Sequence, residues 1–150
     1  MSIFEPHGDF SLQAEGDLLV ISACGAWNLE TSKAYSLACK SKVKRHFAAR
    51  AFYTLICTYD WLPTHDSLET LRDITRWAIE HGMLAQAYCF SNQLEAELLS
   101  THINSLEQDR VLRRSFTYEG AARQWLKLVA QQRGSAPMNA FKPPLTELQQ

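Results

Sequence analysis

The chain has 150 residues, of which 46% are hydrophobic, 11% aromatic and 21% charged, and its formal net charge at pH 7 is -1. This length suits one ordinary domain with a buried core, and the composition excludes a disordered or fibrous chain. A nearly neutral chain lacks the overall basic excess of most nucleic-acid-binding proteins. No apolar stretch approaches the roughly 20 residues of a membrane span, and residues 1–16 contain no Lys or Arg for a secretory signal. We therefore expect a cytoplasmic protein without a membrane span.

The N-terminal third is predicted to form a β-hairpin followed by a helix. Residues 10–14 alternate apolar and polar side chains, residues 15–17 have turn composition, and residues 18–24 are rich in strand formers. Asn28 suits the N-cap of a helix over residues 29–46.

The middle of the chain carries the strongest strand signal. Residues 51–59 are apolar, aromatic or β-branched throughout, which is typical of a strand covered on both faces in a parallel sheet. Residues 60–65, interrupted by Pro63, are predicted to form a loop. Asp66 and Glu69 then have the spacing of a capping box, which predicts that a helix begins there.

The last elements continue the alternation of strands and helices. Residues 83–90 form another short apolar run, and Asn92 with Glu95 repeats the capping-box spacing ahead of a third helix. Residues 110–116 are predicted to form the final strand, and residues 118–131 have the apolar spacing of the final helix.

The predicted order is therefore ββαβαβαβα. Strands that alternate with helices imply crossovers onto a mostly parallel sheet with helices on its faces. We predict an α/β sandwich with a central sheet of about five strands, an N-terminal hairpin and about four helices. Residues 1–134 are expected to form a single domain, and residues 135–150 a Pro-containing C-terminal tail.

Neither a metal nor a cofactor is expected. The four cysteines are widely spaced without a CxxC, so they are interpreted as reduced core residues rather than disulfides or metal ligands. They are Cys24, Cys39, Cys57 and Cys89. The five histidines lack HxH or HExxH spacing, and the segment around Gly25 lacks the glycines of a dinucleotide-binding or P-loop motif.

Ligands of open α/β sheets usually bind beyond the carboxyl ends of the strands. The candidate binding residues there are Trp27, Asn28, Tyr59, Asp60, Trp61, Thr64, His65 and Ser67. In one interpretation Asp60 and His65 face a pocket with Trp61 as its apolar wall, and Thr64 or Ser67 is a phosphorylation site. In the other, this segment only caps a helix and covers the core. No GxSxG motif accompanies the Asp, His and hydroxyl groups, so no catalytic residue is assigned and a protein that is not an enzyme is expected.

Positive charge is concentrated in one part of the chain, because residues 31–59 contain no Asp or Glu. The predicted basic patch consists of Lys40, Lys42, Lys44, Arg45 and Arg50. It would attract an anionic lipid head group, a phosphate or an acidic partner. The alternative is a solvated helix face offset by the acidic hairpin. Aromatic residues do not alternate with these cations, so no specific nucleic-acid binding is expected.

The order of elements and several short segments resemble the SpoIIAA-like, or STAS, superfamily. Residues 18–25 (LLVISACG) followed by 28–31 (NLET) look like the second strand, its glycine and the first helix of that family. Residues 111–116 followed by 118–126 look like the last strand and helix of its uncharacterised SpoIIAA-like branch. The resemblance implies a small non-catalytic domain of a fold whose members bind proteins, nucleotides or lipids. Residues 59–64 stand where the phospho-switch antagonists carry Asp-Ser-Ser-Gly, so a phosphoserine is not carried over.

Two functions follow as hypotheses. The first is a regulatory or protein-interaction domain that acts through residues 60–67 and the neighbouring helix. The alternative is a domain that binds a small anionic or apolar molecule, or a lipid, in an aromatic pocket lined by Trp27, Tyr59 and Trp61. An enzyme using Asp60 and His65 as acid and base ranks third. A homodimer is compatible with the chain, since two-fold dimers are the commonest assemblies.

Overall fold

Five strands form one mixed sheet in the order β1-β2-β3-β4-β5. The computed structural model describes residues 8–103 and 111–135. The strands are β1 (Asp9–Glu15), β2 (Leu18–Trp27), β3 (Phe52–Pro63), β4 (Met83–Cys89) and β5 (Leu112–Phe116). Only the hairpin β1–β2 is antiparallel, and β2, β3, β4 and β5 pair in parallel. The predicted α/β class, hairpin and mostly parallel sheet are confirmed.

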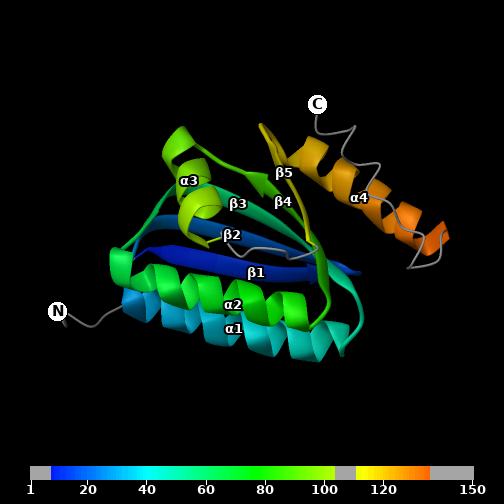
Figure 1. Ribbon diagram of the computed structural model, residues 1–150, viewed down its shortest axis with the longest axis horizontal. Coiled ribbons are helices and arrows are strands. Elements are labelled where there is room, and N and C mark those ends of the chain that lie inside the picture. The colour runs from blue at the N-terminus through cyan, green and yellow to red at the C-terminus, as the bar shows by residue number, and fades with distance from the viewer. Residues whose placement is uncertain (1–7, 104–110, 136–150) are drawn as a thin grey trace.

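Helices cover both faces of this sheet (Figure 1). They are α1 (Leu29–Phe47), α2 (Leu68–Glu80), α3 (Gln93–Leu98) and α4 (Glu119–Ser135). A 3₁₀ turn, η1 (His65–Ser67), precedes α2, and a wider π turn, η2 (Leu99–Ile103), follows α3. In Figure 1, α1 and α2 run side by side over one face of the sheet, whereas α4 lies on the other. None of the described helices is both long and apolar enough to cross a membrane.

The core is divided by the sheet into two layers. Phe52 and Ile56 of β3 face α1 and α2, whereas Leu55 faces α4 and packs with Trp125 and Val129. Because the first half of β3 is covered on both sides, residues 52–57 are mostly apolar without alternation, as the sequence predicts. A continuous apolar run is thus the mark of the central strand.

The predicted loop over residues 60–65 is wrong at its start, because β3 continues to Pro63. Between the register pairs Cys24–Tyr59 and Ala26–Leu62, β2 has one residue and β3 has two, which makes a β-bulge. Asp60 in this bulge has a left-handed backbone, with φ of 49°. Pro63 is tolerated because it is the last residue of the strand, where Pro interrupts no further pairing.

The two predicted capping boxes have opposite outcomes. At α3 the box is confirmed: the Glu95 amide donates to Asn92 Oδ1 over 3.0 Å, and the Asn92 amide donates to Glu95 Oε1 over 3.1 Å. At α2 it is wrong, because Ser67 occupies the N-cap and makes no side-chain cap bond. The Asp66 carboxylate accepts instead from the Thr64 hydroxyl, so it stabilises the turn η1.

Two further predictions need correction or lie outside the described residues. The cysteines were predicted as core residues, yet only Cys39 is fully buried, and Cys24 is exposed on β2. Cys57 and Cys89 are half-buried register partners on β3 and β4. Residues 136–150 of the predicted tail lie outside the described residues.

Candidate functional site

Trp27 and Trp61 meet at the carboxyl end of the central strands. Trp27 ends β2, and the bulge at Asp60 turns Trp61 towards the helices α1 and α2. Their ring centroids lie 5.7 Å apart at an angle of 87°, and both side chains are buried. The Trp27 indole N–H donates to the main-chain oxygens of Asp9 and Cys24 over 3.1 Å each. The two rings therefore form a fixed aromatic corner.

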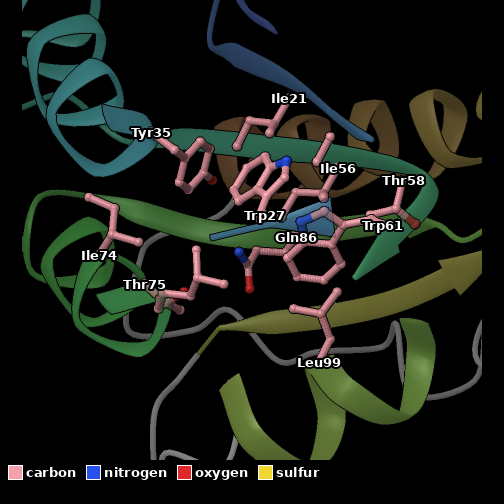
Figure 2. A pocket seen from close by; sticks show the side chains of 12 residues that line it. Ile21, Trp27, Tyr35, Ile56, Thr58, Trp61, Ile74, Thr75, Gln86 and Leu99 are labelled. Carbon is pink, nitrogen blue, oxygen red and sulfur yellow. The ribbon is translucent and has the colours of Figure 1, made fainter. Parts of the chain in front are cut away.

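This corner lines a cavity of about 40 Å³ between the sheet and the helices (Figure 2). Its walls are formed by Ile21, Ala23, Trp27, Tyr35, Ile56, Thr58, Trp61, Leu71, Ile74, Thr75, Gln86 and Leu99. Figure 2 shows the two tryptophan rings and Gln86 on the sheet side, with Ile74 and Thr75 facing them from α2. No charged side chain is among these walls.

Most polar groups at the cavity already have partners. Gln86 Oε1 accepts from the Tyr88 hydroxyl over 2.6 Å and from Arg113 Nε over 2.8 Å. The Thr75 hydroxyl donates to the Leu71 carbonyl over 2.9 Å. The Gln86 side-chain oxygen and the Thr75 hydroxyl therefore already have hydrogen-bond partners and do not need a ligand to supply one.

Trp61 Nε1 is the exception among the cavity walls. It is buried and has no hydrogen-bond partner in the described part of the chain. A buried donor without a partner costs about 1–3 kcal/mol. Trp125 Nε1 is in the same condition on the other face of the sheet, but Trp125 lines no cavity with these residues.

Tyr35 closes the cavity on the α1 side. Burial raises the pKa of its phenol well above the ordinary value, and the neighbouring thiol of Cys39 reinforces that rise. Burial likewise raises the pKa of Cys39, to about 12. Both groups therefore stay protonated and uncharged at neutral pH, and the cavity remains electrically neutral.

The Glu95 carboxylate holds this end of the molecule together, although its side chain is fully buried. Its Oε1 accepts from the Thr58 hydroxyl over 2.8 Å, from the Ser91 amide over 2.6 Å, and from the Asn92 amide. Its Oε2 accepts from the Trp61 amide over 2.7 Å. Burial by itself raises the pKa of Glu95, but the bonds from Trp61, Thr58 and Ser91 outweigh it, so the pKa lies below its ordinary value.

The spacing of Asn92 and Glu95 predicted only a helix cap for Glu95. Its carboxylate instead joins α3, on which Glu95 lies, to β3 and to the β4–α3 connection. The N3 position of a capping box was the only sequence signal for it. The cavity residues Tyr35, Thr75 and Gln86 were not singled out at all, because their common position depends on how three elements pack.

The remaining predicted binding residues do not line the cavity. Tyr59 points to the opposite face of the sheet, beside Cys24 and Cys57, and is 71% exposed. Asp60 and His65 are both exposed, and neither is among the residues that line the cavity beside Trp61.

Asn28, Thr64 and Ser67 have local structural partners. Asn28 caps α1, where its Oδ1 accepts from the Thr31 amide over 2.9 Å. The hydroxyl oxygens of Thr64 and Ser67 lie 2.9 Å apart. Ser67 is fully buried, whereas Thr64 is exposed, so of the two predicted phosphorylation sites only Thr64 is accessible.

The predicted basic patch is divided in the folded chain. Lys40 and Lys44 lie on one side of α1, where each Nζ is 5.9 Å from the ring centroid of Trp77 on α2. Arg50 turns away: it donates to the carbonyls of Phe47 and His46 and pairs with Asp17 at 3.5 Å. The helical repeat puts the other two predicted members, Lys42 and Arg45, on different sides of α1 from Lys40.

Comparison with known proteins identifies the fold. A solved structure of an uncharacterised protein of the DUF3478 family from Shewanella loihica PV-4, described as having a SpoIIAA-like fold, superposes with a TM-score of 0.54. The match covers 84% of this chain and 98% of that chain, at 15% sequence identity. This chain has a SpoIIAA-like fold. No family model and no curated protein matches the sequence, so this similarity speaks for the fold of the SpoIIAA-like domain alone.

Proposed function

We propose that this SpoIIAA-like domain binds a small uncharged molecule in the cavity beside Trp27 and Trp61. The observation that carries the proposal is the buried indole N–H of Trp61, which has no partner among the described residues and belongs to a side chain that lines the cavity. A ligand with one hydrogen-bond acceptor would satisfy that donor. Its apolar body would replace empty space against the aromatic rings.

The size of the cavity limits the ligand. The space beside Trp61 measures about 40 Å³, and a second space of about 40 Å³ continues along Ile21, Tyr35 and Ile74 towards Phe52. A single water needs roughly 10–15 Å³, whereas pockets for drug-sized ligands measure about 300–1,000 Å³. The two spaces together therefore suit a molecule no larger than one small ring. A lipid chain would require α2 to move away from the sheet.

The charge of the cavity limits the ligand as well. Its walls carry no charged side chain, and Tyr35 is held in its neutral form. An ion placed there would lose its hydration without gaining a counter-ion, which is costly. Of the small anionic and apolar ligands expected from the sequence, we therefore favour the apolar, uncharged class.

The test compares two probes of the same shape. Benzene and pyridine differ by one ring acceptor, and pyridine is uncharged at pH 8. We expect pyridine to raise the free energy of unfolding more than benzene, with a gain of about 2.7 kcal/mol at 100 times its dissociation constant. Failure of both probes to stabilise the protein would overturn the proposal.

Two tryptophan variants sharpen this test. Trp61→Phe removes the donor that the ligand would use, so the difference between pyridine and benzene should disappear. Trp125→Phe also removes a buried indole N–H without a partner, but Trp125 does not line the cavity. This control should keep the difference, and loss of it in both variants would mean that the probes do not bind beside Trp61.

A regulatory or protein-interaction role is the second candidate, and a separate observation favours it. Three large apolar side chains, Tyr59, Leu62 and Leu94, are 71%, 48% and 52% exposed. They belong to the same end of the molecule, because the Asp60 amide donates to Ser91 Oγ over 2.9 Å and so ties β3 to the start of α3. Exposed large apolar residues at one end of a domain are typical of protein contacts.

A photo-crosslinker tests this second candidate in extracts of the host organism. Placed at Leu62, it should yield one recurring conjugate with another protein. Placed at Leu128, which is 40% exposed on α4, it should not. Conjugates only with a second copy of this chain, or equal yields at both positions, would rule the surface out as a docking site.

Both candidate functions are non-catalytic and are proposed for a cytoplasmic protein. The four free cysteines support that compartment, since secreted domains of this size commonly use disulfides. The homodimer stays a prediction.

A further inference from the structure

A line of basic residues follows the solvent-facing side of α1. Lys33, Lys40 and Lys44 are spaced by seven and four residues, and Leu37 lies between them. This spacing places all four on one side of a helix. Leu37 is 70% exposed, which makes it the most exposed large apolar residue of α1. We name these four residues the lysine stripe.

Trp77 of α2 borders the lysine stripe. The Nζ atoms of Lys40 and Lys44 both lie 5.9 Å from its ring centroid, and the ring of His81 stacks on the Trp77 ring with centroids 3.9 Å apart. Figure 1 shows the two helices running side by side, so the stripe and Trp77 share one surface. Two ammonium groups are therefore held next to one apolar ring.

The positive charge of the lysine stripe is not neutralised within the described part of the chain. Lys33, Lys40 and Lys44 form no ion pair there. The neighbouring acid of α2, Asp73, is occupied by Arg76 at 3.2 Å. Like charges four residues apart on a helix repel each other, and this repulsion would be relieved by an external anionic group.

We propose that the lysine stripe and Trp77 form a docking site for an acidic, amphipathic segment of another protein. The three lysines extend along about 16 Å of α1, at 1.5 Å per residue, which matches several carboxylates in a row better than one phosphate. Leu37 and Trp77 offer contact for an apolar side chain between those carboxylates. None of these residues lines the cavity beside Trp61, although Trp77 lines the second space that continues from it.

The surroundings favour a peptide over an anionic bilayer. Glu30 lies in the first turn of α1 and Glu80 is the last residue of α2. A uniformly anionic surface would be repelled by these acids near the ends of the stripe, whereas a single segment can place its carboxylates against the lysines alone.

The experiment uses a fluorescent helical peptide of 16 residues with Glu along one side and Leu beside them, and a matched peptide with Gln in place of each Glu. We expect the acidic peptide to bind the full chain and to lose at least tenfold in affinity between 50 and 300 mM salt. We expect the Gln peptide to bind at least tenfold more weakly. Equal binding of both peptides, or none, would overturn the proposal.

Two charge-reversed variants locate the site. Lys40→Glu with Lys44→Glu should weaken binding of the acidic peptide at least tenfold. Lys42→Glu with Arg45→Glu changes the net charge equally on other sides of the same helix and should leave binding within twofold. Equal loss in both variants would contradict the site. Vesicles of phosphatidylcholine with 30% phosphatidylserine provide a further test. If they bind through Lys40 and Lys44 while the peptide does not bind, the lysine stripe is a membrane-binding surface and the proposal is contradicted.

Discussion

Two neighbouring tryptophans differ in how their indole N–H groups are satisfied. Trp27 donates to two main-chain oxygens, of Asp9 and Cys24, whereas Trp61 donates to no group of the described chain. The two rings are otherwise alike, since both are buried and contact each other. Replacing either ring by Phe removes the same volume. The difference in the free energy of unfolding between the two variants therefore measures what the hydrogen bonds of Trp27 contribute.

We expect Trp27→Phe to lower the free energy of unfolding more than Trp61→Phe does, by about 1–3 kcal/mol. Both variants lose the same volume, but only Trp27→Phe leaves two partly buried acceptors without their donor. Urea unfolding monitored by circular dichroism measures the difference. Equal losses would show that the Trp61 N–H is already satisfied.

Glu95 is the most heavily hydrogen-bonded side chain at this end of the domain. Replacement by Gln keeps its size but removes the charge and turns one acceptor into a donor. At pH 7 we expect Glu95→Gln to lower the free energy of unfolding by about 1.5–3 kcal/mol, the range of hydrogen bonds to charged groups. Glu97→Gln, on the exposed side of α3, should change it by less than about 0.5 kcal/mol.

The effect of Glu95 should also depend on pH. Its pKa is lower in the folded chain than the ordinary value of 4.5. The charged form therefore stabilises the fold above pH 4.5, and this contribution is lost as the pH falls through the folded pKa. The gap between wild type and Glu95→Gln should shrink on acidification below pH 4.5, and a gap that widens there would contradict the inferred role.

At the scale of the elements, the β-bulge determines where Trp61 points. An extra residue in β3 reverses the alternation of side chains after Tyr59, so Trp61 enters the core and Leu62 is exposed. Asp60 accepts the left-handed backbone that this requires, with φ of 49°, and its amide is held by Ser91.

Variants at Asp60 test the bulge. Gly adopts a positive φ without strain, so Asp60→Gly should change the free energy of unfolding by less than about 1 kcal/mol. Val is β-branched and disfavours this conformation, so Asp60→Val should be less stable than Asp60→Gly by about 1–2 kcal/mol. Thermal and urea unfolding would measure both, and equal stability of the two variants would count against a strained bulge.

The outcomes at these elements show which signals a sequence carries. The capping box of Asn92 and Glu95 was predictable because both partners lie within one helical turn. The extension of β3 was not, since Asp60 and Pro63 are typical loop residues and the pairing that keeps them in the strand comes from β2. A helix cap could thus be predicted because its partners are close in sequence. The end of β3 could not, because pairing with β2 outweighs the local preference for a loop.

At the scale of the whole molecule, the alternation of strands and helices was sufficient to predict a mostly parallel sheet, and the SpoIIAA-like resemblance is confirmed at the level of the fold. The candidate site was only partly predictable. Trp27 and Trp61 were expected as pocket walls and do lie together, but Tyr59 was placed with them and lies on the other face. The bulge changes the face of the sheet on which the side chains after Tyr59 lie. No pattern within residues 51–63 predicts the bulge.

The most direct measurement is a titration of the indole N–H signals in a ¹H–¹⁵N spectrum of the full chain with pyridine and with benzene. Pyridine should shift the Trp61 signal as its N–H gains an acceptor, while the Trp125 signal, whose N–H is also buried without a partner, stays in place. Benzene should move the Trp61 signal less. A Trp61 signal that responds to neither probe, or equally to both, would contradict a ligand site built on this donor.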